Sequence, residues 1–532
     1  MRLDNIPLSL EEEVEGAEGG LFKAVAVRLG LPRSAILGLT ALKRSIDTRG
    51  QPRLIYSVHV EVERPGSWRG GLPEGVREAE DFYRLPDRSV PESGRRSRVV
   101  VVGAGPAGLF AALALARAGL RPTLLEQGKP VETRAMDVSR LMHWGELQNF
   151  SNLCFGEGGA GTWSDGKLTT RIGAPQVRFV LETLVEMGAP SRILIDGKPH
   201  LGTDRLVALL KTMRAALIEH GAEVRFGVRV EDLAVSGGRV VGVKLSDGEV
   251  IDADRVVLAA GHSARALLEA LAARGVAMSP KAFAVGFRVE HPQQAIDAIQ
   301  YGRHAEHPLL PPADYRLSAN FEVDGHQRGV YSFCMCPGGQ VVPTPTEADG
   351  VVVNGMSHAA RSGAFANSAL VVTVEPGDFG GDGLMAGFDF QRRAERRAGA
   401  MGGGLFRAPA QTVSDFLADR SGGDVRKTSY TPGVTSADLS RCYPDFVTRS
   451  LKEALRRWGR RMPAFVAEEA VLIGVETRTS APIQVERGAD LQSTTIAGLY
   501  PCGEGSGHGG GIVSAAVDGL RVADAIVEAL AG

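Results

Sequence analysis

Three glycines spaced as G-x-G-x-x-G, Gly103, Gly105 and Gly108, lie between an apolar run and a helix-forming stretch. In dinucleotide-binding folds the first permits a tight turn, the second lets a diphosphate approach the backbone, and the third lets helix and strand pack closely. The free N–H groups at the start of the helix, around Pro106 and Ala107, then bind the diphosphate. These residues predict a dinucleotide site.

An acidic residue, Glu126, follows Gly108 by 18 residues and ends the next predicted strand. A carboxylate at this place accepts hydrogen bonds from the adenosine ribose and would repel a 2′-phosphate. We therefore expect FAD or NAD rather than NADP, with Glu126 and the adjoining Gln127 near the ribose. Glycines that only turned the chain would not require an acidic residue here.

The C-terminal segment GLYPCGEGSGHGGGIVSAAVDGL distinguishes FAD from NAD. It predicts a strand, a turn at Gly503 and Glu504, and a helix that begins near Gly511 and Ile512. The positive end of that helix would stabilise negative charge on a reduced flavin, whereas an NAD dehydrogenase has no need of this element. Since Gly503 lies 377 residues after Glu126, other residues must be inserted into the FAD domain.

Three intermediate segments are expected to contact FAD. A predicted strand at 226–230 would meet the adenine, and a strand at 251–261 would end beside the dinucleotide. The loop GEGGAGTWSDGKL at 156–168 would present N–H groups to the diphosphate or the flavin. The residues assigned to FAD in these segments are Gly158, Gly159, Ala160, Gly161, Thr162, Val230, Ala260 and Gly261.

Three side chains are candidates for catalysis. Lys167 could hold a flavin or substrate anion, or could form a salt bridge with Asp165 or Glu157. Arg478 could bind a carboxylate through two hydrogen bonds, or could pair with Glu476.

His508, the third catalytic candidate, lies in the C-terminal glycine loop and could relay a proton or attach the flavin covalently. The alternative is a loop histidine bonded to the backbone. Cys334 and Cys336 form C-x-C, which is either a redox pair or buried packing, and the packing interpretation is favoured because so short a disulfide ring is strained.

Bulk properties narrow the class of protein. The chain has 532 residues, 44% hydrophobic and 23% charged, and a net charge of −2, which does not favour recruitment of nucleic acid or an anionic membrane. It shows no signal-peptide pattern and no apolar run of about 18 residues. Five cysteines are too few for a disulfide framework and lack zinc-ligand spacing, so no metal is expected. We expect a cytoplasmic location.

The elements that must position these residues suggest a two-part FAD domain. We expect an α/β fold: a Rossmann-like FAD-binding domain, with a three-layer parallel sheet, that is split by an inserted α+β substrate domain and preceded by a small α+β module. The expected ranges are 1–64 for the module, 65–97 for a linker, 98–274 and 471–532 for the FAD domain, and 275–470 for the inserted domain.

Several further stretches resemble one known family. They include LKRSID at 42–47, GEGGAGTWSDGKL at 156–168, GFRVEHPQ at 286–293, SFCMCPGG at 332–339, and VETRTSAP at 475–482. With these motifs the chain resembles the uncharacterised FAD-dependent dehydrogenases of bacteria along nearly its whole length. The resemblance implies FAD and a two-domain flavoprotein behind a small N-terminal module, and implies no substrate. The family's terminal motif usually reads G-E-G-A-G-Y-A-G-G-I, whereas Ser506, His508 and Gly509 depart from it here.

The predicted function is an FAD-dependent oxidoreductase, a dehydrogenase, reductase or oxygen-using enzyme, that exchanges hydride at flavin N5 with an unidentified small molecule. NAD(P)H or O2 could exchange electrons transiently. The alternatives are an FAD-dependent RNA-modifying enzyme that uses basic residues of the N-terminal module, and a monooxygenase or oxidase of specialised metabolism. Residues 1–63 hold eight basic and nine acidic side chains, which disfavours a nucleic-acid partner. We also expect no membrane contact, because the net charge is near zero and no long apolar run is present.

Overall fold

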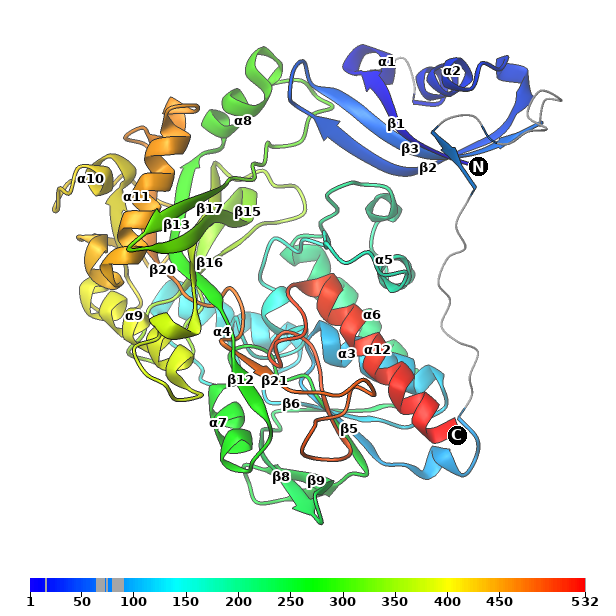
Figure 1. The fold of residues 1–532 in the computed structure, drawn as a ribbon, viewed down its shortest axis with the longest axis vertical. Coiled ribbons are helices and arrows are strands. Elements are labelled where there is room, and N and C mark those ends of the chain that lie inside the picture. The colour runs from blue at the N-terminus through cyan, green and yellow to red at the C-terminus, as the bar shows by residue number, and fades with distance from the viewer. Residues whose placement is uncertain (15–16, 64–71, 73–74, 79–89, 532) are drawn as a thin grey trace.

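The computed structural model describes residues 1–14, 17–63, 72, 75–78 and 90–531. Figure 1 shows a small N-terminal module in blue at the top, a mostly antiparallel sheet with its helices on the left, and a parallel sheet with its helices at the lower right.

A five-stranded parallel sheet, ordered β22-β11-β5-β6-β7, forms the centre of the dinucleotide-binding region. Its strands are β5 (Val99–Val102), β6 (Thr123–Glu126), β7 (Glu223–Phe226), β11 (Arg255–Leu258) and β22 (Leu499–Pro501). The C-terminal strand β22 pairs in parallel with β11, which in turn pairs with β5. The expected α/β fold, with one sheet assembled from two distant parts of the chain, is confirmed.

The two faces of this sheet are covered differently. Val99 and Val101 belong to the apolar core that contains the helices, whereas Val100 and Val102 belong to the core beneath a small antiparallel sheet. Successive side chains of a strand point to opposite faces, which explains the alternation. The helices are α3 (Pro106–Arg117), α4 (Val131–Trp144), α5 (Gln176–Glu186), α6 (Thr203–Glu219) and α12 (Ile512–Ala531), and the small sheet is β8 (Val230–Ser236), β9 (Arg239–Leu245) and β10 (Val250–Asp252). The expected three layers are therefore present.

The inserted region is built around a second sheet, ordered β14-β15-β17-β13-β20-β18-β19, with β16 paired to β15. Its strands are β13 (Phe283–Pro292), β14 (Ser318–Val323), β15 (His326–Pro343), β16 (Val353–Met356), β17 (Phe365–Val374), β18 (Ala408–Thr412), β19 (Val434–Ser436) and β20 (Val471–Glu476). Its helices are α8 (Gln293–Tyr301), α9 (Ala386–Gly402), α10 (Val413–Leu417) and α11 (Asp445–Gly459). The chain passes twice between the FAD-binding and inserted regions. The short strands at these two passages, β12 (Met278–Pro280) and β21 (Ile483–Val485), pair as a two-stranded antiparallel sheet.

The inserted sheet extends past the boundary expected at residue 470. Strand β20 pairs with β13 and β18, so residues 471–476 belong to this sheet rather than to the FAD-binding region. All six residues of β20 are buried. A fully buried strand has the same sequence character in either sheet, which is why the boundary could not be placed from the sequence.

The N-terminal module is a four-stranded sheet with two helices. Its elements are β1 (Arg2–Ser9), α1 (Leu10–Val14), α2 (Ala17–Leu29), β2 (Ile36–Asp47), β3 (Arg53–Val62) and β4 (Val76–Arg77). The main chain of Arg44 in the edge strand β2 forms hydrogen bonds with Ile195 and Gly197. Arg49 and Arg53 both pair with Asp47, so these basic side chains are engaged in ion pairs.

Two expected strands are wrong in extent. The strand expected at 226–230 is a break between β7, which ends at Phe226, and β8, which begins at Val230, because Gly227 turns the chain with φ +71°. The strand expected at 251–261 is divided into β10 and β11, which pair in different sheets. In both segments, residues that favour strands lie on each side of the turn. The composition therefore predicts one continuous strand where the structure has two.

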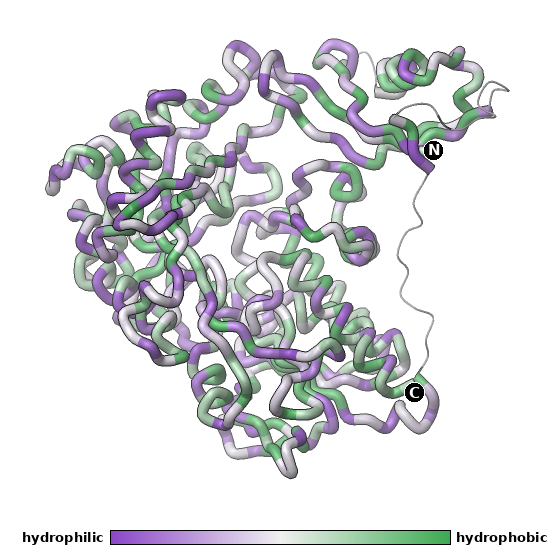
Figure 2. The backbone as a smooth tube through the Cα atoms, viewed as in Figure 1, coloured by the Kyte–Doolittle hydropathy of each residue, from purple (hydrophilic) through white to green (hydrophobic). Residues whose placement is uncertain are grey.

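The expected linker is only partly described. Most of 65–97 lies outside the described residues, but β4 falls within the range and pairs with β1 of the module. Figure 2 shows hydrophilic and hydrophobic residues interspersed in every part of the chain. Within the described residues, no helix combines the length and the apolar character needed to cross a membrane.

Candidate cofactor and active site

A cavity of about 950 Å³ lies where the strands of the parallel sheet end and the inserted region begins. Both regions contribute to its wall. The predicted cofactor residues that line it are Gly103, Gly105, Pro106, Ala107, Glu126, Gln127, Gly159, Ala160, Gly161, Val230, Ala260, Gly261, Glu504, Gly511 and Ile512. Gly108, Gly158, Thr162 and Gly503 are not in the lining, although each adjoins it.

The three motif glycines have different surroundings. Gly103 has φ +104°, and a Cβ there would overlap the carbonyl oxygen of Ala259, in the loop that follows β11. A Cβ on Gly108 would overlap the carbonyl oxygen of Gly103, so helix α3 could not approach β5. A Cβ on Gly105, in contrast, would meet nothing closer than the Cα of Gly159, at 4.0 Å, and would project into the cavity. These surroundings fit the roles that the spacing predicts.

Glu126 holds the loops around the motif together. Its carboxylate accepts hydrogen bonds from the N–H groups of Ala104, Gly128 and Gly156, each at 2.9 Å. Oε2 accepts only the Ala104 N–H among the described residues, so it retains acceptor capacity toward the cavity. The sequence predicts a ribose contact for Glu126, and the structure adds this second role as an anchor.

The glycine loop is fixed by a buried arginine that sequence reasoning missed. The Arg134 guanidinium donates to the carbonyl oxygens of Asn152, Leu153, Glu157 and Gly159 at 2.6–3.1 Å. The loop backbone is thereby held with its glycine N–H groups near the motif. Arg134 lies in α4 within no recognisable motif, so no sequence signal indicated its role.

The C-terminal segment contributes the opposite side of the cofactor cradle. Gly503 has φ +72°, and its N–H donates to Asp518 in α12 at 2.8 Å. Glu504 lines the cavity, and burial raises the pKa of its carboxyl to about 7. Helix α12 begins at Ile512 and directs its N-terminus at the cavity wall.

The residues present fit FAD. A dinucleotide diphosphate needs N–H donors with no side chain in front of them, and Gly105 with the start of α3 provides them. A ribose needs a carboxylate acceptor at the end of the second strand, and Glu126 is there. A flavin needs a helix N-terminus at its pyrimidine edge, and α12 provides one.

Lys167 lies in the cavity wall, and neither of the expected acidic partners is paired with it. Asp165 is buried and accepts hydrogen bonds from the Arg361 guanidinium and the Ser357 hydroxyl. Glu157 instead pairs with Arg214 at 3.2 Å. The charge of Lys167 therefore faces the cavity without an ion pair to these two acids.

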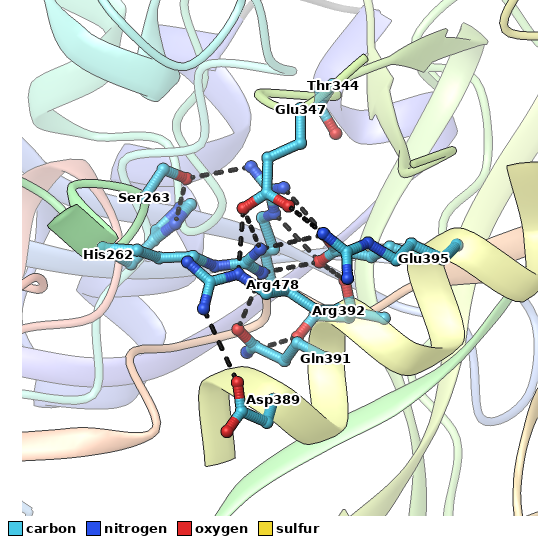
Figure 3. A network of polar contacts seen from close by, with 12 residues as sticks. His262, Ser263, Thr344, Glu347, Asp389, Gln391, Arg392, Glu395 and Arg478 are labelled. Carbon is cyan, nitrogen blue, oxygen red and sulfur yellow. Dashed lines mark hydrogen bonds and ion pairs between the residues drawn. The ribbon is translucent and has the colours of Figure 1, made fainter. Parts of the chain in front are cut away.

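Arg478 is paired with Glu395, and the alternative of a pair with Glu476 is wrong. Its Nε and Nη2 contact the two carboxylate oxygens of Glu395 at 3.2 and 3.0 Å. Glu476, at the end of β20, pairs with Arg288 of β13 instead, at 2.7 Å. Figure 3 shows Glu395 reaching from α9 toward Arg478.

This carboxylate also connects the two regions. Arg265, in α7 (Arg265–Ala273), donates to Glu395 at 2.8 and 3.1 Å and to Gln391 at 3.1 Å. Burial would raise the pKa of Glu395, but the two arginines hold it well below its usual range. Glu395 and Gln391 lie in α9, a helix with many charged residues and no recognisable motif, so no pattern in the sequence indicated their role.

His508 lies beside the cofactor cradle but is not part of the cavity lining in the described residues. Its Nε2 atom is 2.8 Å from the carbonyl oxygen of Val485. Burial lowers the pKa of the imidazole, with a smaller contribution from Arg487. The geometry is that of a loop histidine bonded to the backbone, the alternative considered above.

Comparison with known proteins gives matches along the chain. Family models described as "FAD binding domain", "FAD dependent oxidoreductase" and "FAD-dependent protein, C-terminal domain-like" match residues 98–140, 203–316 and 282–479, and a domain of unknown function matches residues 2–63. An uncharacterised protein of Clostridium beijerinckii is 42% identical over 99% of this chain and 98% of its own length.

Other similarities are partial. Protein FixC of Escherichia coli is 28% identical over 37% of this chain, and the match spans 44% of FixC, less than half of its length. Among solved structures, halogenase PltM in complex with phloroglucinol and FAD has a TM-score of 0.36 and 12% identity, with 82% of this chain and 70% of that chain covered.

Proposed function

The chain belongs to a family of uncharacterised FAD-dependent oxidoreductases, and from that premise we propose that it exchanges hydride between FAD and a small molecule inside the cavity. The observation that supports this most is that the glycines of the cofactor cradle share one cavity with Cys334 and Asn354 of the inserted sheet. A substrate held by the inserted sheet would lie against the cofactor. The same region would cover it from bulk water, as hydride chemistry requires.

When bound, FAD supplies the two-electron acceptor, or in reduced form the donor, for hydride exchange at N5. The chain's own residues orient the reactants around it. The N-terminus of α12, at Ile512, carries the positive end of a helix of 20 residues and would stabilise negative charge at that side of the cavity. Arg134 and Glu126 hold the loops of the cradle in place through their hydrogen bonds to the backbone.

Lys167 is the residue we assign to an anionic group of the substrate. Because Arg361 and Ser357 already bind Asp165, the ammonium group of Lys167 is not neutralised by that neighbour. A cation in a wall with little water attracts an anion more strongly than a cation in bulk solvent does. The expected substrates are therefore small carboxylates or phosphate esters with an oxidisable carbon, or their reduced counterparts.

NAD(P)H or O2 would exchange electrons in the same cavity. The two further G-x-G-x-x-G spacings, at 156–161 and 505–510, both lie in the glycine loops assigned to the FAD cradle, so a nicotinamide would visit the flavin directly rather than bind at a site of its own. Hydride acceptance from NAD(P)H and from substrate would then compete for one space.

An anaerobic screen of the FAD-loaded protein tests the proposal. Small anionic hydroxy acids, amino acids, phosphate esters and NAD(P)H are mixed with the protein, and loss of the oxidised-flavin absorbance is recorded. We expect at least one anionic compound to reduce the flavin, with Lys167→Met raising its half-saturating concentration about tenfold or more, which corresponds to about 1.4 kcal/mol.

Lys198→Met is the matched control, since Lys198 is an exposed lysine paired with Asp314. It should leave reduction unchanged. Reduction by uncharged compounds alone, with the same saturation in Lys167→Met as in wild type, would contradict the assignment of an anionic substrate.

A further inference from the structure

Two cysteines of the inserted sheet lie at the cavity, at an irregular point of the long strand β15. The pairing of β15 with β17 shifts register between Phe333 and Cys336. Cys334 has φ +45°, a left-handed conformation that non-glycine residues rarely adopt. Cys334 is half-buried in the cavity wall, whereas Cys336 is fully buried behind it. The bend thus turns one thiol toward the cofactor space and keeps the other in the protein.

The Cys336 thiol contacts the backbone of Cys334, and one arginine contacts both residues. The Cys336 thiol donates to the carbonyl oxygen of Cys334 at 3.3 Å. Arg288 donates to the same carbonyl at 3.0 Å, and its Nη1 lies 3.8 Å from the Cys336 Sγ. This arginine is fully buried and also pairs with Glu476 at 2.7 Å. A fixed positive charge therefore lies beside the Cys336 sulfur, and it also acts electrostatically on the Cys334 thiol.

Charged groups from other elements also face the pair. Lys167 lies across the cavity wall, Asp165 is held by Arg361, and Glu504 approaches from the C-terminal turn. The neighbouring Cys336 side chain, followed by the charges of Lys167 and Arg288, lowers the pKa of the Cys334 thiol. The Cys334 side chain, together with burial, raises the pKa of the Cys336 thiol.

We propose that Cys334 and Cys336 are a redox-active pair that exchanges two electrons with FAD. Cys334, at the cavity surface, is the sulfur that meets the cofactor or an incoming disulfide, and Cys336 is its buried resolving partner. The proposal rests on the binding of FAD and not on the substrate class proposed above, so either can fail without the other.

The step balances without a further reactant. In one direction, the Cys334–Cys336 disulfide bond breaks as one electron pair and one proton leave the anionic reduced cofactor. Cys334 becomes a thiolate, Cys336 becomes a thiol, and the cofactor returns to its oxidised form. In the other direction, the thiolate and thiol lose the same electrons and proton to oxidised FAD, and the S–S bond forms.

Both the ring size and the charges favour the reduced pair. A disulfide across C-x-C closes a short, strained ring, which makes it easier to reduce. A stabilised thiolate has the same effect, as in disulfide oxidants whose reduced form is favoured. We therefore expect electrons to pass from the reduced cofactor to the disulfide, so that the pair acts as an internal electron acceptor.

Two of the three other cysteines, Cys442 and Cys502, show what ordinary packing looks like in this chain. Burial raises the pKa of Cys442 to about 12 and that of Cys502 well above its usual value. Neither has a left-handed backbone. Cys334 differs from both in its left-handed backbone, in being only half-buried, and in having its pKa lowered rather than raised.

Counting electrons in the FAD-loaded protein tests the pair. The protein is treated with a mild thiol oxidant, freed of it, and titrated anaerobically with dithionite while the flavin absorbance is followed. We expect the wild type to take up four electrons per FAD, and Cys334→Ser and Cys336→Ser to take up two each. Cys442→Ala, a buried cysteine outside the cavity, should still take up four.

A second measurement does not depend on the flavin. Peptide mapping after alkylation should show an intrachain link between residues 334 and 336 in the oxidised protein and two alkylated cysteines after reduction. Uptake of two electrons by the wild type, with both cysteines alkylated after oxidation, would overturn the proposal. So would a disulfide that involves a different cysteine.

Discussion

Arg478 and Glu395 form a two-contact ion pair in the wall of the cavity, with Nε–Oε1 and Nη2–Oε2 distances of 3.2 and 3.0 Å. Both side chains are buried, and Glu395 also binds Arg265 across the boundary between the FAD-binding and inserted regions. A single carboxylate therefore fixes an arginine of the cavity wall and joins the regions that enclose it.

We expect Glu395→Gln to destabilise the protein by about 3–5 kcal/mol, because two buried guanidinium groups lose their shared counter-charge. Urea unfolding followed by tryptophan fluorescence measures the loss. Asp349→Asn is the control, because Asp349 and Arg396 form an exposed pair that should be worth less than about 1 kcal/mol. Equal losses in the two variants would show that the buried pair has no special role.

Alanine substitutions of two motif glycines should cause two different defects. Gly105→Ala should fold with an unchanged melting temperature, since nothing of the protein opposes a Cβ there, but should bind FAD at least about tenfold more weakly because the methyl group occupies the diphosphate's place. Gly108→Ala should lose stability as well as FAD, because its Cβ overlaps the Gly103 carbonyl.

Melting curves of apo protein and fluorescence titration with FAD separate the two glycine defects. Gly173→Ala is the control for both measurements, since Gly173 is exposed and a Cβ there meets nothing. An FAD affinity in Gly105→Ala equal to that of wild type would mean that the diphosphate does not lie against this glycine.

Glu504 predicts a pH-dependent stability of the apo protein. Its folded-state pKa is raised to about 7 by burial, so the folded state binds the proton more tightly than the unfolded state does. The stabilisation is complete below the ordinary carboxyl pKa and is lost as the pH rises through about 7. It amounts to about 3 kcal/mol or less. Glu504→Gln should abolish this component.

The Glu504 measurement is the difference in unfolding free energy between wild type and Glu504→Gln at several pH values. As the pH rises from the ordinary carboxyl pKa to above 7, the wild type should lose unfolding free energy relative to Glu504→Gln. A difference that does not change with pH would exclude a raised carboxyl pKa at this position.

His508 is predicted to act through its backbone contact. His508→Ala should lower stability by about 1 kcal/mol, because the Val485 carbonyl loses its hydrogen bond, and should leave the pH profile of flavin reduction unchanged. His508→Gln, which can donate to the same carbonyl, should recover part of the stability. A displaced pH profile in His508→Ala would instead support the proton relay that its place in the sequence suggests.

The cofactor cradle could be predicted from the sequence because its residues are constrained locally. Gly103, Gly108 and Gly503 stand where backbone approach or positive φ excludes side chains, and such positions leave a readable spacing. The bounds of β5 and the start of α12 at Ile512 follow from the same local patterns.

The rest of the site depends on contacts between residues far apart in the sequence. Arg134, Glu395 and the partner of Arg478 carry no motif, and only the folded chain shows that Arg478 meets a residue of α9 rather than Glu476. The predicted boundary of the inserted region at residue 470 was misplaced for the same reason. A run of buried apolar residues such as β20 is compatible with either sheet, and only the strand pairing shows which sheet it belongs to.

The most direct test of the account is to identify and count the cofactor released from the purified protein. The split cradle predicts one FAD per chain in wild type, released by acid and identified by mass, and a protein that folds but retains little FAD in Gly105→Ala. A wild-type protein that binds NAD or no dinucleotide at all, under conditions where free FAD is in excess, would contradict it.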